Sequence, residues 1–79
     1  MIRPATLDDL PAVWELILEL AEFERLRSEV TGSLEQLRAH FGSAFHLHVY
    51  ECDGEIVAYA LWFRNFSTFL TRPGIYLED

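Results

Sequence analysis

The fold is decided by residues 45–63, FHLHVYECDGEIVAYALWF. Its first part, residues 45–52, alternates apolar and polar side chains with a period of two, which predicts a half-buried strand. Asp53-Gly54 then matches the two-residue turn in which both residues take positive φ angles. Residues 55–63 form a second apolar run. The stretch therefore predicts an antiparallel β-hairpin.

The second strand of this hairpin is apolar on both sides. One parity carries Ile56, Ala58, Ala60 and Trp62, and the other carries Val57, Tyr59, Leu61 and Phe63. This pattern is typical of a strand buried on both faces. Because a chain of 79 residues buries a small core, we expect it to be a fragment, to bind a partner chain, or to form a domain-swapped assembly.

A strand and a helix are predicted before the hairpin. Met1–Ala5 reads as a first strand near a sheet edge, with Ile2 as its inward residue. Thr6, Asp8 and Asp9 offer side-chain oxygens to a helix start, and Pro11 suits the first turn. Apolar residues then recur at spacings of three and four, namely Val13, Trp14, Ile17, Leu20 and Ala21. This spacing predicts a helix that ends near Glu24 or Arg25.

A second, short helix follows a polar connection. Ser33 and Gln36 have the spacing of a capping box, and Gly42 suits the left-handed conformation that ends helices. After the hairpin, residues 64–73 read as a loop rich in aromatics, and residues 74–79 as the opening of another strand. The order strand-helix-helix-hairpin-strand predicts one incomplete α+β domain over residues 1–79, with a mostly antiparallel sheet and two helices on one face.

The composition excludes several functional classes. Thirteen acidic residues against six arginines give a net charge of −7, so the chain lacks the basic stripe that a nucleic-acid binder needs. An acidic surface favours cationic partners such as amines. Charges interrupt the apolar segments too often for a membrane span. The N-terminus lacks the apolar stretch of a secretory signal, so we expect a cytoplasmic protein.

The histidines and the cysteine are interpreted as structural. His46 and His48 lie two apart on one strand, a geometry that can begin a metal site, but no further ligand motif completes it. Cys52 has acidic neighbours, which disfavour the nucleophilic thiolate. A single cysteine also excludes an internal disulfide. We therefore expect no metal site and no catalytic cysteine.

Carboxylates and loop aromatics are the candidates for chemistry. Glu78 and Asp79 are adjacent on an apolar strand, which puts one side chain on each face. Because burying an unpaired carboxylate is costly, this pair would bind a cation or accept a proton. The alternative is that these last residues are simply solvated. Glu24 lies at a helix end, where it can leave the solvated helix face. Phe66 and Phe69 fall in the predicted loop and are candidates for the wall of a site.

These segments together resemble a family. The resemblance extends over the whole chain. The segments that carry it are Ile2-Arg3-Pro4-Ala5-Thr6, Leu20-Ala21 with Phe23-Glu24, Phe66-Ser67-Thr68-Phe69 and Gly74-Ile75-Tyr76-Leu77-Glu78-Asp79. They resemble the N-terminal half of the GCN5-related N-acetyltransferases, in particular the diamine (spermidine/spermine) and thialysine branch.

The resemblance implies an enzyme that transfers acetyl directly from acetyl-CoA to a primary amine of a small polyamine or an amino-acid-like substrate. It assigns substrate binding to Phe23, Glu24, Phe69, Glu78 and Asp79, with the last two as candidate catalytic residues. The family's pyrophosphate loop is not found in these 79 residues, so acetyl-CoA would be the co-substrate of the complete domain. The chain alone is then expected to be inactive, and a homo-oligomer such as a dimer is expected.

An alternative from a different class is a non-catalytic α+β interaction module. Such a module would pair with another chain through its exposed sheet edge. Sequence continuing into a glycine loop would favour the enzyme.

Overall fold

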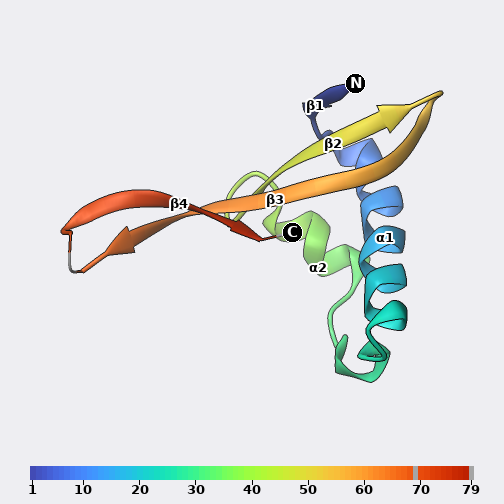
Figure 1. Ribbon diagram of the computed structural model, residues 1–79, viewed down its shortest axis with the longest axis horizontal. Helices are drawn as coiled ribbons and strands as arrows, with labels where there is room; N and C mark the ends of the chain where they lie inside the picture. Colours follow the sequence, from blue (N-terminus) through green and yellow to red (C-terminus); the bar gives the residue numbers. More distant parts are fainter. Residues whose placement is uncertain (69, 79) are drawn as a thin grey trace.

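The computed structural model describes residues 1–68 and 70–78 (Figure 1). The elements, in chain order, are β1 (Ile2–Pro4), the 3-10 turn η1 (Leu7–Asp9), α1 (Leu10–Phe23), the 3-10 turn η2 (Arg27–Glu29), α2 (Leu34–His40), β2 (His46–Cys52), β3 (Glu55–Ser67) and β4 (Arg72–Glu78). This arrangement confirms the predicted α+β class with two helices.

The four strands form one antiparallel sheet in the order β1-β2-β3-β4. β1 and β4 are therefore its edges among the described residues. The turn between β2 and β3 has φ values of 53° at Asp53 and 78° at Gly54. Both angles are positive, as the Asp-Gly hairpin turn requires, and the predicted hairpin is confirmed.

A β-bulge interrupts the pairing of β2 with β3. Tyr50 pairs with Ala58 whereas Glu51 pairs with Ile56, so Val57 is the additional residue on β3. The bulge reverses the facing of the strand at this point. Ile56 consequently packs against the same core as Tyr59 and Leu61, and the predicted single alternation along β3 is wrong across Val57.

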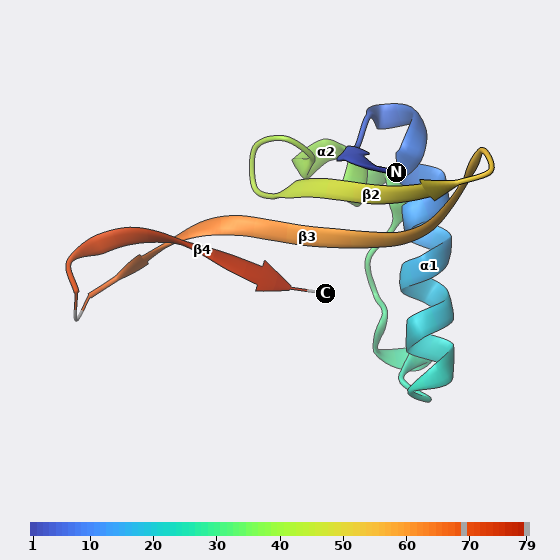
Figure 2. The ribbon, with the colours of Figure 1, turned by 45° about the horizontal axis from the view of Figure 1, so that its top comes forward.

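The core lies between the helices and one face of the sheet. Its buried members are Leu10 and Val13 of α1 and Leu47 and Val49 of β2. Residues of α2 pack against the same four side chains, so both helices cover one face (Figure 2). Among the described residues, no helix is long and apolar enough to cross a membrane.

The opposite face of the sheet, here called the open face, is not covered by any described element (Figure 2). A shallow apolar hollow of about 300 Å³ lies on it. Residues that line the hollow include Ile2, His48, Tyr50, Ala58 and Ala60. The strand β3, which the sequence predicts to be apolar on both faces, is thus covered by helices on one face and uncovered on the open face.

The first strand faces the other way from the prediction. Ile2 is 72% exposed, while Arg3 is only half-buried and points toward α1. The reason is the register, because Arg3 pairs with the buried Val49 and Ile2 pairs with the exposed Tyr50. The prediction of Ile2 as the inward residue is wrong.

The predicted loop at residues 64–73 is also wrong in part. β3 continues to Ser67 and β4 begins at Arg72, so most of this segment is a two-stranded ribbon that extends beyond the helices (Figure 1). Pro73 pairs with Phe66. The proline is tolerated because β4 is an edge strand, where its missing N–H need not have a partner.

Candidate functional site

A groove of about 280 Å³ opens where α1 ends beside the sheet. Three parts of the chain build it: the last turns of α1, the segment through η2, and the middle of β3. The lining residues are Ile17, Leu20, Ala21, Glu24, Leu26, Glu29, Val30, Tyr59 and Leu61. The walls are thus mainly apolar, and two carboxylates stand among them.

The end of α1 shapes this groove. Leu26 N–H donates to Ala21 O at 2.7 Å and Arg25 N–H donates to Glu22 O at 3.0 Å. These are the two hydrogen bonds of a Schellman motif, in which the residue directly after the helix C-cap adopts a left-handed conformation. That residue is Arg25, with φ of 60°. The motif reverses the chain, so that Leu26 returns to the groove beside Ala21.

Glu24 and Glu29 give the groove its charge. Glu24 is the C-cap residue of α1, and Glu29 lies in the last position of η2. Both are exposed residues of the lining, and the described lining contains no arginine or histidine. An ammonium group would therefore meet negative charge at the rim and apolar wall beneath it. Glu24, to which the resemblance assigns substrate binding, is thus one of the two carboxylates of the lining.

The end of β4 comes to the same part of the sheet. The backbone of Glu78 pairs with Leu61, which lines the groove. Asp79 lies outside the described residues, and so does the predicted position of Phe69. Farther along the ribbon, the rings of Phe63 and Tyr76 stack with centroids 5.1 Å apart.

Two of the predicted aromatic residues do not line the groove. Phe23 is 87% exposed at the end of α1. Phe66 is 59% exposed on the ribbon and lies five positions along β3 from Leu61, which is about 17 Å at strand spacing. The structure thus places Glu24 in the lining of the groove and pairs the Glu78 backbone with one lining residue, Leu61, but separates Phe66 from it. Sequence reasoning missed Glu29, Leu26 and Tyr59.

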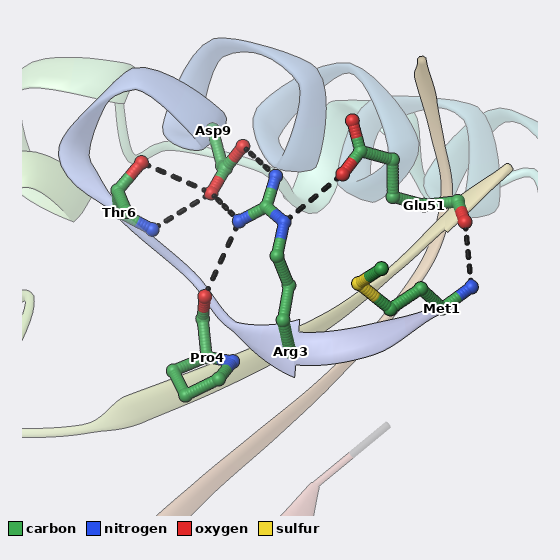
Figure 3. Close-up of polar contacts among 6 residues, drawn as sticks. All are labelled: Met1, Arg3, Pro4, Thr6, Asp9 and Glu51. Carbon is green, nitrogen blue, oxygen red and sulfur yellow. Dashed lines mark hydrogen bonds and ion pairs between the residues drawn. The ribbon is translucent and has the colours of Figure 1, made fainter. Parts of the chain in front are cut away.

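A polar clasp joins the first strand to the start of α1 (Figure 3). Arg3 donates from Nη1 to Asp9 Oδ2 at 2.7 Å and from Nη2 to Asp9 Oδ1 at 2.9 Å. Its Nε donates to Glu51 Oε1 at 3.1 Å. The guanidinium and the Thr6 N–H, at 2.7 Å, hold the pKa of Asp9 well below its usual range. Asp9 therefore holds β1 and the Thr6 turn together. We expected its side chain to cap α1, but it makes no capping hydrogen bond to that helix.

His46 and His48 belong to an aromatic stack with Trp62. The ring of His46 stacks on Trp62 with centroids 4.4 Å apart, and Trp62 Nε1 donates to His48 Nδ1 at 3.2 Å. His48 Nδ1 is thereby engaged as a hydrogen-bond acceptor. Within residues 1–68 and 70–78, no three histidine, cysteine or acidic side chains are placed to share a metal ion.

The described residues do not fit the pyrophosphate of acetyl-CoA. Such a group needs successive backbone N–H groups from a glycine-rich loop at a helix N-terminus. Gly42 and Gly54 lie singly in turns, and Gly32 precedes the seven-residue α2, whose cap is Ser33. The described part of the chain offers a mainly apolar groove with two carboxylates in its lining rather than a nucleotide cradle.

Comparison with known proteins supports the resemblance. The chain is 39% identical over 90 aligned positions to a thialysine N-ε-acetyltransferase of Bos taurus, with all of the chain and 52% of the relative covered. It is 40% identical to the proteins of that name from Mus musculus and Sus scrofa, again over 52% of each relative. A scan against protein-family models finds no match.

The chain spans about half the length of the curated relatives it matches. The alignments cover 99% or more of the chain itself, so the similarity is not confined to a single motif. The chain is therefore similar over nearly its whole length to one part of the thialysine N-ε-acetyltransferases, as the resemblance in its motifs predicts.

Proposed function

We propose that the chain is the amine-binding half of an acetyl-CoA-dependent N-acetyltransferase for a small primary amine. The observation that carries the proposal is the groove at the end of α1, where carboxylates rim an apolar wall beside β3. The names of the relatives support an acetyl transfer. The acceptor is an amino acid of the thialysine kind or a polyamine, and the protein works in the cytoplasm.

The residues of this chain would orient the amine. In the reaction, the amine nitrogen bonds to the acetyl carbon as the carbon–sulfur bond breaks, and the leaving thiolate takes a proton. An ammonium cannot attack, so the acceptor must first lose a proton. Glu24 would hold the acceptor in the groove, while Glu78 or Asp79 would orient the reacting amine and assist its deprotonation.

The test is an acetyl-transfer assay on the complete protein, with the 79-residue chain beside it. The complete protein is expected to release the thiol of acetyl-CoA when a small primary amine is added, whereas the chain alone should neither turn over nor bind acetyl-CoA. Micromolar affinity of the isolated chain for acetyl-CoA in calorimetry would overturn this division. Absence of transfer to every small amine would overturn the enzyme proposal.

The second candidate is a non-catalytic interaction module. The open face and the exposed edge of β4 favour it. It predicts a complete protein without transferase activity that binds another chain through this face.

A further inference from the structure

We propose that two copies of this chain associate through the open face, and that the charge on His48 controls the association. The proposal does not depend on acetyl transfer. The chain exposes 6096 Å², about 1,200 Å² more than a compact chain of 9.2 kDa. Because a standard interface buries roughly 800 Å² on each partner, this excess is large enough to receive a second copy.

The open face presents large apolar side chains that suit contact with an identical surface. Tyr50 of β2 pairs with Ile2 of β1 and with Ala58 of β3, and cross-strand partners share one face of a sheet. Ile2 is 72% exposed and Tyr50 is 43% exposed. The described lining of the hollow between them contains no carboxylate. The same patch can therefore lie against itself, as a two-fold interface requires.

His48 is the histidine in the lining of this hollow. Its Nδ1 accepts a hydrogen bond from Trp62 Nε1 at 3.2 Å, and a neutral imidazole that accepts at Nδ1 carries its proton on Nε2. A second proton would occupy Nδ1 and face the indole N–H, donor against donor. The hydrogen bond to Trp62 therefore requires an uncharged His48.

The described neighbours of His48 supply no negative charge to an imidazolium. They are Pro4 of β1, His46 and Tyr50 of β2, and Ala60 and Trp62 of β3. The charged residues of β3 that share this face are Glu55, near the hairpin turn, and Arg64, at the start of the ribbon. Each lies four or more positions from Ala60, which is about 13 Å at strand spacing. A second copy on this face would thus bury an unpaired cation, which is costly.

Acid should consequently weaken the association. Histidine is the side chain whose charge changes between about pH 5 and 8. General electrostatics has the opposite sign, because the chain has a net charge of −7 at pH 7 and an isoelectric point near 4.7. Acidification toward the isoelectric point reduces the repulsion between copies. Weaker association in acid therefore identifies a histidine effect rather than an effect of net charge.

Sedimentation equilibrium of the 79-residue chain at about pH 8 and about pH 5.5 tests the proposal. The dissociation constant of the wild type should rise about ten-fold or more in acid. His48→Gln should associate equally at both pH values, because its amide stays uncharged and can still accept from Trp62. His40→Gln is the matched control, since His40 is exposed at the end of α2, on the covered side of the sheet, and it should keep the wild-type response.

A wild type that is monomeric at both pH values would overturn the interface. An equal dissociation constant at both, or a His48→Gln variant that responds to acid as His40→Gln does, would overturn the role of His48. Circular dichroism of the wild type should be the same at the two pH values. Loss of the folded signal in acid would attribute the dissociation to unfolding and would also overturn the role of His48.

Discussion

At the scale of single residues, the carboxylate of Asp9 joins β1 to the turn at Thr6, which precedes α1. It accepts four hydrogen bonds, two from Arg3 and two from Thr6, and the residue is 9% exposed. Asp9→Asn should lower the free energy of unfolding at pH 7 by about 2 kcal/mol, because charge-assisted bonds are lost. Urea denaturation measures this, and the exposed neighbour variant Asp8→Asn should change stability little.

The same residue predicts an acid dependence. The pKa of Asp9 is lowered in the folded state, below about 3.9 for the unfolded chain. Its contribution is therefore complete above about pH 4 and is lost as the pH falls toward the folded-state pKa. The stability difference between wild type and Asp9→Asn should accordingly shrink between pH 4 and pH 2. A difference that stays constant over this range would contradict the assignment.

The carboxylates proposed to bind the substrate give a kinetic prediction. In the complete protein, Glu78→Gln and Asp79→Asn should raise KM for a cationic amine about ten- to a hundred-fold, with KM for acetyl-CoA nearly unchanged. Glu24→Gln should have a smaller effect that weakens further in high salt, because Glu24 is exposed. Initial rates over a pH series measure both effects. Unchanged kinetics for both C-terminal variants would mean that the pair is structural.

At the scale of elements, the end of α1 holds a strained residue. Arg25 has φ of 60°, which costs a non-glycine residue about 1 kcal/mol. Arg25→Gly removes this cost, whereas Arg27→Gly, in the 3-10 turn two positions later, only adds backbone freedom to the unfolded chain. We expect Arg25→Gly to be more stable than Arg27→Gly by about 1 kcal/mol in urea denaturation. Equal stabilities would show that the reversal is unstrained.

The elements that local chemistry specifies were predictable. Asp53-Gly54 specifies its turn by conformation alone, and Ser33 caps α2 as expected, with Gln36 N–H donating to its Oγ at 3.2 Å. The bulge at Val57 and the extension of β3 to Ser67 depend on pairing with other strands. Such long-range pairing leaves no local signal, so polar Asn65 and Ser67 looked like a loop.

The site was predictable only in part, for a related reason. Glu24 was identifiable because it ends a clearly periodic helix and follows the motif of a known family. Glu29 lies in a polar connection and reaches the groove only because Arg25 reverses the chain. An arginine in a left-handed conformation is not expected from sequence. The position of Phe66 was misjudged together with the ribbon that carries it.

At the scale of the whole molecule, the chain exposes more surface than its mass predicts. Its accessible area is 6096 Å², whereas a compact monomer of 9.2 kDa would expose about 4,900 Å². The excess of about 1,200 Å² exceeds the roughly 800 Å² that each partner buries in a standard interface. The additional exposed area comes from the ribbon of β3 and β4, which extends beyond the helices (Figure 1), and from the open face.

We therefore expect the isolated chain to self-associate at micromolar concentration through the open face. Sedimentation velocity should show species larger than 9.2 kDa. Ala58→Glu places a charge in the hollow of the open face and should shift the chain toward monomer, because burying an unpaired carboxylate is costly. Ala39→Glu, at an exposed position of α2, is the matched control and should leave association unchanged. A compact wild-type monomer with a cooperative thermal transition would show that the open face tolerates water, and association unaffected by Ala58→Glu would assign the contact to the edge of β4.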